Sequence, residues 1–230
     1  MFHVSGVLFV ILLIGCWILF WLSASAVKKM PWVWYAACLA ADALLLAGVS
    51  GVLGHGVWMV VSPLMKKGLL ALAVFFVVML MGCFPTGGKV GKRLRPIRAE
   101  LSIMACILVA GHMGVYVMRY LALVLQGVAP KANVMVALVL AIALLALLVP
   151  LFVTSFHRVR RAMDSASWKR LQRWAYVFFG LTYVHILVML APGILAGTRP
   201  ALASAACYTL AFAAYALLRV RYALHPSRSF

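Results

Sequence analysis

Long runs of apolar residues, separated by short polar or basic segments, make up most of this chain. Reading the runs between charged residues and Gly or Pro breaks gives seven candidates, each close to the roughly 20 residues that cross a bilayer as a helix. They are residues 4–22, 32–53, 66–84, 99–122, 132–156, 171–191 and 201–222. Lipid cannot hydrogen-bond a backbone, so these runs must be helices, whereas a β-barrel would show short alternating segments. The pattern predicts an all-α, polytopic transmembrane bundle of about seven spans, forming one domain over residues 1–230.

The composition also indicates a membrane protein. Hydrophobic residues make up 67% of the chain and charged residues only 10%, whereas a soluble domain is roughly half apolar and a quarter charged. The formal net charge is +18, but the basic residues lie in short loops, where topology and anionic lipid account for them. We therefore expect membrane lipid and no nucleic acid as a partner. The five cysteines lack the spacing of a disulfide or metal framework.

The basic residues are divided unequally between alternate loops. One side holds Lys66, Lys67, Arg119, Lys131 and Arg199. The other side holds the remaining basic residues: Lys28, Lys29, Lys89, Lys92, Arg93, Arg95, Arg98, Arg158, Arg160, Arg161, Lys169, Arg170, Arg173, Arg219, Arg221 and Arg228. Cytoplasmic loops are enriched in Lys and Arg, so the richer side is predicted to be cytoplasmic. An odd number of spans then places the N-terminus outside and the C-terminus in the cytoplasm, in the inner membrane of a cell.

Two histidines are predicted to lie at one depth inside the membrane. His112 follows Arg98 by 14 residues and His185 follows Arg173 by 12. At about 1.5 Å of rise per residue they lie roughly 21 and 18 Å from the cytoplasmic edge. Both spans run outward, so the helices are parallel. Two imidazoles at one level can ligate one haem iron; alternatively, each histidine could simply hydrogen-bond to a neighbouring helix.

Three further residues, Gly111, Arg119 and Asp42, each allow two interpretations. Gly111 next to His112 could let a flat macrocycle approach the backbone or let two helices pack closely. Arg119 could bind a haem propionate or extend to the outer headgroups. Asp42, halfway along the second predicted span, could carry protons beside a quinol site or pair with a buried polar group.

Two stretches carry a resemblance to a known family. In the first, Arg98 is followed 14 residues later by His112, with Tyr116 one turn on. In the second, Thr154 and Ser155 precede a basic loop, Trp168, Leu171, Tyr176 and His185. The chain resembles the ferric-reductase-like transmembrane domain family, most closely its MsrQ group of haem-bearing membrane subunits, over residues 66–222. The resemblance implies a b-type haem between His112 and His185, with Tyr116 beside it, and a redox partner that receives electrons.

The sequence departs from that family in two respects. The family has a histidine after Trp-x-x-Leu, where this chain has Gln172, so a second haem, or FMN, would lack that residue. The family core has six spans, and this chain has an additional one at residues 4–22.

We expect a membrane electron-transfer protein with one haem b. It would pass electrons from quinol or a cytoplasmic flavoprotein toward the outer face or to a partner redox subunit. Two alternatives remain: a cofactor-free transporter or channel in which Asp42, Arg119 and the histidines line a polar path, and a structural anchor subunit of a larger complex. Transporters often have helices broken at the midplane, and the Gly and Pro breaks here fall at the ends of the predicted spans.

The predicted orientation can be tested with C-terminal fusions. A fluorescent protein fused to the C-terminus should be bright, and alkaline phosphatase fused there should be inactive, because the first folds in the cytoplasm and the second only outside it. An active phosphatase and a dark fluorescent protein would reverse the orientation.

Overall fold

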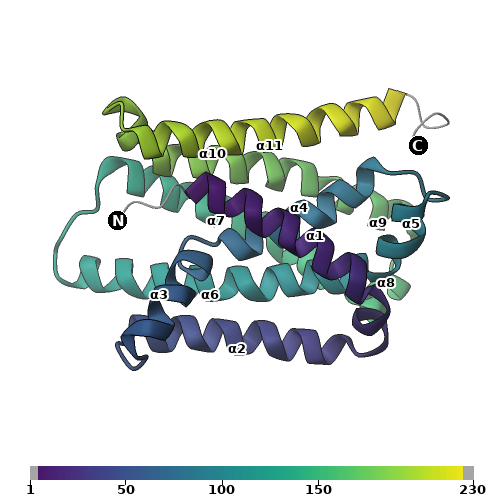
Figure 1. The fold of residues 1–230 in the computed structure, drawn as a ribbon, viewed down its shortest axis with the longest axis horizontal. Coiled ribbons are helices and arrows are strands. Elements are labelled where there is room, and N and C mark those ends of the chain that lie inside the picture. Colours follow the sequence, from purple (N-terminus) through teal and green to yellow (C-terminus); the bar gives the residue numbers. More distant parts are fainter. Residues whose placement is uncertain (1–4, 225–230) are drawn as a thin grey trace.

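The computed structural model describes residues 5–224 and contains no strand within that range (Figure 1). The helices are α1 (Ser5–Lys29), α2 (Pro31–Val49), α3 (His55–Met65), α4 (Leu69–Leu80), α5 (Lys89–Leu94), α6 (Arg98–Leu125), α7 (Ala132–Val153), α8 (His157–Ala162), α9 (Ser165–Gln172), α10 (Trp174–Leu195) and α11 (Arg199–Leu224), with 3₁₀ turns η1 (Met81–Cys83) and η2 (Arg95–Ile97). Seven segments of the described chain are long and apolar enough to cross a membrane. The all-α fold class and the number of spans are therefore confirmed.

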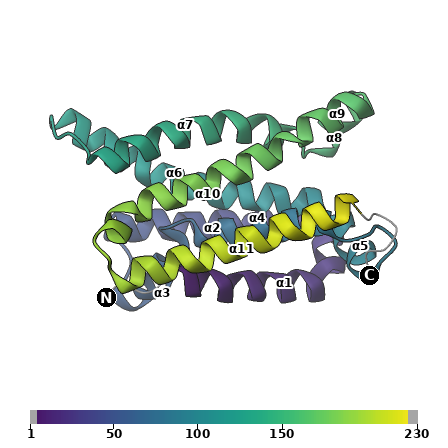
Figure 2. The same ribbon diagram turned by 90° about the horizontal axis from the view of Figure 1, so that it is seen from above.

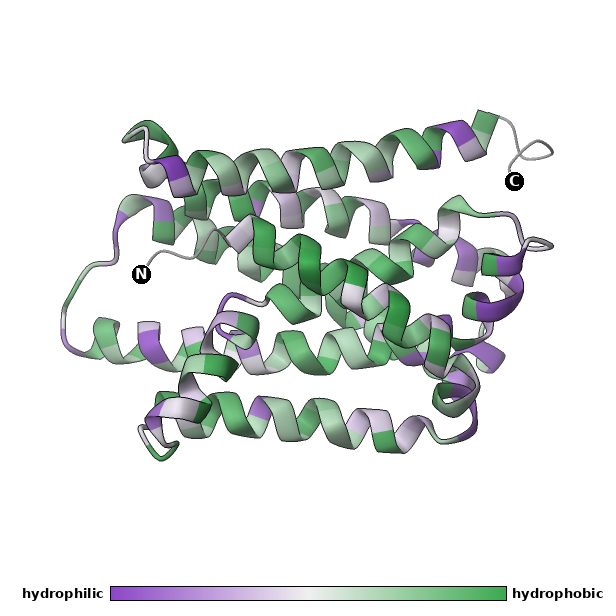
Figure 3. Ribbon diagram, in the orientation of Figure 1, coloured by the Kyte–Doolittle hydropathy of each residue, from purple (hydrophilic) through white to green (hydrophobic). Residues whose placement is uncertain are grey.

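The exposed surface of the helices is apolar. Ile142 on α7 and Leu210 and Leu217 on α11 are 70, 70 and 71% exposed, and hydrophobic residues line the bundle along its length (Figure 3). Hydrophilic residues gather at the end that holds α5, α8 and α9. A soluble monomer rarely exposes contiguous apolar surface on this scale, so the sides of the bundle suit contact with lipid chains.

The first and last long helices lie side by side and run in the same direction. The Ser5 hydroxyl lies 3.3 Å from that of Ser204, and the Gly6 amide donates to the same Ser204 oxygen at 3.3 Å. One turn further along, the rings of Phe9 and Tyr208 are 5.2 Å apart. A Cβ on Gly6 would meet the Ser204 backbone at 2.8 Å, so glycine permits this close approach. Parallel α1 and α11 put the start of α1 and the end of α11 at opposite ends of the bundle (Figure 1).

A cluster of aromatic rings forms the middle of the core. Phe76 on α4 is 1% exposed, and its ring centroid lies 4.7 Å from those of Phe179 on α10 and Phe212 on α11 and 5.1 Å from that of Phe9 on α1. Offset and edge-to-face pairs of this kind add to the energy of burial. The cluster therefore joins four helices that are distant in the sequence but adjacent in the fold (Figure 2).

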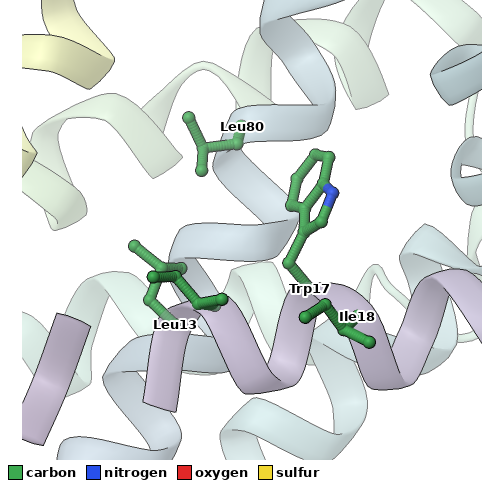
Figure 4. Close-up of a pocket in the computed structure, with 5 residues that line it drawn as sticks. Leu13, Trp17, Ile18 and Leu80 are labelled. Atoms are coloured by element: carbon green, nitrogen blue, oxygen red, sulfur yellow. The ribbon is translucent and has the colours of Figure 1, made fainter. Parts of the chain in front are cut away.

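Beside this core, α1 and α4 leave a cavity of about 180 Å³. Leu13, Ile14, Trp17, Ile18 and Leu80 line it (Figure 4). The lining is apolar, so this cavity offers no group that could orient or transform a polar ligand.

The third span differs from its prediction. We expected it at residues 66–84 with unbroken helix, but the apolar segment begins at His55 and is interrupted between α3 and α4, at Lys66–Gly68. Gly68 has φ +66°, a left-handed conformation that ends a helix. The break lies at the start of the predicted span 66–84 and inside the longer apolar segment His55–Cys83.

Candidate functional site

His112 on α6 is oriented by the broken third span. Its Nδ1 lies 3.0 Å from the carbonyl oxygen of Lys66. A carbonyl oxygen can only accept a hydrogen bond, so Nδ1 must carry the proton and donate it. The Nε2 of the neutral ring then carries a lone pair. A hydrogen bond from the far nitrogen to a backbone carbonyl is how proteins usually orient a metal-ligating histidine.

The hydrogen bond from His112 to Lys66 also satisfies a backbone carbonyl at the helix break. The break between α3 and α4 leaves carbonyl groups without helical partners inside an apolar segment, where an unpaired polar group is costly. His112 supplies a donor to one of them, and its ring lies against Gly68, where a Cβ would come within 3.4 Å of the imidazole. His112 therefore also has a structural role in capping α3.

His185 lies on α10 where that helix packs against α7. Its ring is near the carbonyl of Ala137, and its Nδ1 is buried without a hydrogen-bond partner in the described chain. The rings of His112 and His185 are close enough to interact electrostatically. Both histidines that the sequence singled out are half-buried, on α6 and α10.

Tyr116 and Arg119 lie beyond His112 toward the C-terminal end of α6. The rings of His112 and Tyr116 are 4.9 Å apart, and those of Tyr116 and Tyr120 are 5.9 Å apart and stacked. The spacing of four residues places these three rings on one face of α6. Arg119 is exposed and interacts electrostatically with Tyr116.

Gly111 lies against Asp42. A Cβ on Gly111 would overlap the Asp42 carboxylate, so this glycine lets α2 approach α6. Asp42 is 8% exposed, and its Oδ1 has no hydrogen-bond partner in the described chain. A buried carboxyl oxygen without a donor needs a proton or a polar ligand. The contact with Asp42 supports the interpretation that Gly111 lets two helices pack closely.

Gln172 and Trp168 attach α9 to the end of α7. The Trp168 indole donates to the Thr154 carbonyl at 3.2 Å, and the Gln172 amide donates to the Thr154 hydroxyl at 3.3 Å. At the start of α9, Asp164 accepts from the Ala166 and Ser167 amides, and hydrogen bonds from Ser167 hold the pKa of Asp164 below its usual value. This cap fixes where α9 begins and so where Gln172 lies.

Lys66 and Gly68 were missed as site residues. The sequence carried a signal for them, because Pro63 removes a backbone donor and Lys-Lys-Gly is a common way to end a helix. The lysines were instead interpreted as a loop outside the membrane.

Within residues 5–224, no group of three or more His, Cys, Asp or Glu side chains could hold a metal ion. All five cysteines are free thiols.

Comparison with known proteins gives one similar chain. An uncharacterised protein of Treponema pallidum (strain Nichols) is 37% identical over 202 residues, which cover 86% of this chain and 56% of that protein. The chain therefore spans little more than half the length of its relative. No protein-family model and no solved structure matches.

The contact between Gly111 and Asp42 predicts unequal effects of two glycine substitutions on the same helix. Gly111→Ala should lower the free energy of unfolding by about 1–3 kcal/mol, since the new methyl group overpacks the α2–α6 interface. Gly114→Ala should have little effect, because nothing lies within 4 Å of a Cβ there. Thermal unfolding in detergent would measure both.

Truncating Asp42 to Ala should relieve the closest part of this clash, the contact with the carboxylate, and leave the Asp42 Cβ at 2.9 Å from the added methyl group. The Gly111→Ala, Asp42→Ala double variant should be more stable than the sum of the two single effects predicts. Equal stability of the Gly111→Ala and Gly114→Ala proteins would contradict the contact.

Proposed function

We propose that this chain is a haem b electron-transfer protein of the inner membrane, with His112 and His185 as the two axial ligands. The observation that carries the proposal is the tautomer of His112. Its Nδ1 proton is committed to the Lys66 carbonyl, so its Nε2 lone pair is available to a metal. When bound, haem would supply a one-electron carrier between the two imidazoles.

The residues fit such a group in two further respects. The ring of His185 lies beside the Ala137 carbonyl, and its buried Nδ1 makes no closer hydrogen bond in the described chain, which leaves its Nε2 as the nitrogen that would bind a metal. The two histidines come from α6 and α10 and interact electrostatically. Two protein ligands are enough for a haem iron, because the porphyrin supplies the other four.

The chain's own residues would set the route of the electron. The aromatic row of Tyr116 and Tyr120 continues from His112 toward the outer end of α6, where Arg119 could bind a propionate. Asp42 lies beside Gly111, next to His112 in sequence, and could take the proton released when a quinol is oxidised. The acceptor would be another redox protein or subunit at the outer face.

The resemblance to the ferric-reductase-like transmembrane domain family, and to its MsrQ group, agrees with this proposal. By that resemblance, His112 and His185 would correspond to the residues that hold haem in the family. Nothing in the similarity to the Treponema pallidum protein bears on cofactor or activity, because that protein is uncharacterised.

A second function has a specific observation in its favour. The helix break at Lys66–Gly68 lies beside His112, and transporters bind ions and substrates at such breaks. In a cofactor-free transporter His112 and Asp42 would line the path, and His112 would remain necessary as a cap for α3. The two functions therefore differ in what the Nε2 of His112 does.

Substituting His112 with Asn separates ligation from capping. The Asn side-chain amide can replace Nδ1 as donor to the Lys66 carbonyl, but it has nothing in place of Nε2. His112→Asn should fold nearly as stably as the wild type and lose the reduced α band in the visible spectrum, whereas His112→Ala should lose both stability and the band. His185→Ala should also abolish the band, and exposed His55→Ala should retain it.

A normal low-spin spectrum in His112→Asn and His185→Ala would overturn the ligand assignment. A wild-type protein purified without any haem from cells supplied with haem would favour the transporter.

We also expect one haem per chain. Gln172 stands where a second ligand would be needed, and its amide is bonded to Thr154. His157, the remaining histidine at that level among residues 5–224, lies 3.4 Å from Glu100 and its side chain is 64% exposed. A single haem would lie about 20 Å from the cytoplasmic surface, which favours a quinol bound in the bundle, or a neighbouring haem subunit, over a cytoplasmic flavoprotein as donor.

The ratio of haem to polypeptide, from pyridine haemochrome and quantitative amino-acid analysis, should be near one. A ratio near two would contradict this count and make direct reduction by a cytoplasmic flavoprotein plausible.

A further inference from the structure

Three arginines converge at the end of the bundle opposite the outer tyrosines. Arg95 from η2, Arg98 from α6 and Arg219 from α11 line a cavity of about 220 Å³. Gln172, Tyr176, Tyr222, Met79, Gly82 and Ala175 complete the lining. Arg98 interacts electrostatically with both other arginines, so three positive charges share one small space.

Two of these side chains are held in place by carbonyls at the end of the third span. Arg219 donates to the Gly82 carbonyl at 2.7 Å, and Arg95 donates to the Phe84 carbonyl. The Arg219 guanidinium also lies over the rings of Tyr176 and Tyr222, at 5.3 and 5.6 Å. These contacts use part of each guanidinium, and the buried Nε of Arg95 has no partner in the described chain.

No carboxylate of the described chain neutralises the cluster. The chain has three acidic residues. Asp42 lies against Gly111, Glu100 pairs with His157, and Asp164 caps α9. Within residues 5–224 no hydrogen bond or ion pair joins the Arg98 side chain to another residue. Like charges brought together in a half-buried cavity repel one another, so an anion is needed for this arrangement to be favourable.

We propose that the cavity binds a phosphate group through Arg95, Arg98 and Arg219. A guanidinium presents a planar pair of donors that matches phosphate oxygens, and three positive charges suit a phosphate better than a single carboxylate. Gln172, Tyr176 and Tyr222 also line the cavity, and the Gln172 amide donates to Thr154. The proposal does not depend on haem binding.

Two sources could supply the phosphate: the headgroup of an anionic lipid or a small soluble phosphate compound. The cavity lies at the end where hydrophilic residues gather (Figure 3), and both sources reach that level. The chemistry of recognition is the same in both cases.

The test compares Arg98→Gln with Arg161→Gln in the full chain. Arg161 is exposed on α8, so its substitution removes the same charge at the same end of the molecule and leaves the cavity intact. Thermal unfolding of delipidated protein in detergent is followed against inorganic phosphate at constant ionic strength, since salt alone screens charges. Phosphate should stabilise the wild type and Arg161→Gln equally, and Arg98→Gln should need about ten-fold more phosphate.

A second arm identifies the source. Protein extracted from nanodiscs that contain phosphatidylglycerol and phosphatidylcholine is weighed by native mass spectrometry. If a lipid headgroup occupies the site, wild type and Arg161→Gln retain one phosphatidylglycerol that Arg98→Gln loses. If a soluble phosphate compound occupies it, lipid retention is equal in all three and only the phosphate titration differs.

Arg98→Lys serves as a control in case Arg98→Gln misfolds. The lysine keeps the positive charge but lacks the paired donors of the guanidinium. It should weaken phosphate binding less than Arg98→Gln does. Equal phosphate responses and equal lipid retention in Arg98→Gln, Arg98→Lys and Arg161→Gln would overturn the proposal.

Discussion

The architecture depends on one constraint: inside a bilayer, every backbone polar group needs a partner from the protein itself. A continuous helix meets this constraint by itself, because it satisfies its own backbone. The third span is the exception. Its break at Lys66–Gly68 frees carbonyl groups, and the hydrogen bond from His112 Nδ1 to the Lys66 oxygen satisfies one of them. That bond sets the tautomer of the imidazole, with the proton on Nδ1. Structure and candidate chemistry therefore share one contact.

The fold was largely predictable because hydrophobicity over some 20 residues is a strong signal that needs no tertiary information. The number of apolar helices follows from this signal, and so does the placement of His112 and His185 within two of them. The break in the third span was missed for a local reason: two lysines were interpreted as a loop, although the turn that ends α3 is made by Gly68 with φ +66°. The pairing of Gly111 with Asp42 and the convergence of Arg98 and Arg219 were not predictable, because each joins helices whose relative rotation no sequence pattern fixes.

Two polar levels lie at different depths in the bundle, and a packed aromatic core separates them. His112, His185 and Asp42 occupy one level; Arg95, Arg98 and Arg219 occupy the other. Fourteen residues of α6, about 21 Å, connect Arg98 with His112. Phe76 packs edge to face against Phe179 and Phe212, and the last two rings are tilted against each other. Helix α6 carries residues of both levels, Arg98 at its start and His112 halfway along it.

The parallel seam between α1 and α11 also has a consequence for how the bundle is assembled. The residues that meet there, Ser5 and Ser204, are separated by 199 positions, and contacts of such separation form late because a long loop must close first. While α11 is still being synthesised, α1 and α4 have no neighbour on that side, and the ring of Phe76 is not yet covered by Phe212. The aromatic cluster around Phe76 is therefore complete only once α11 has packed against α1 and α4.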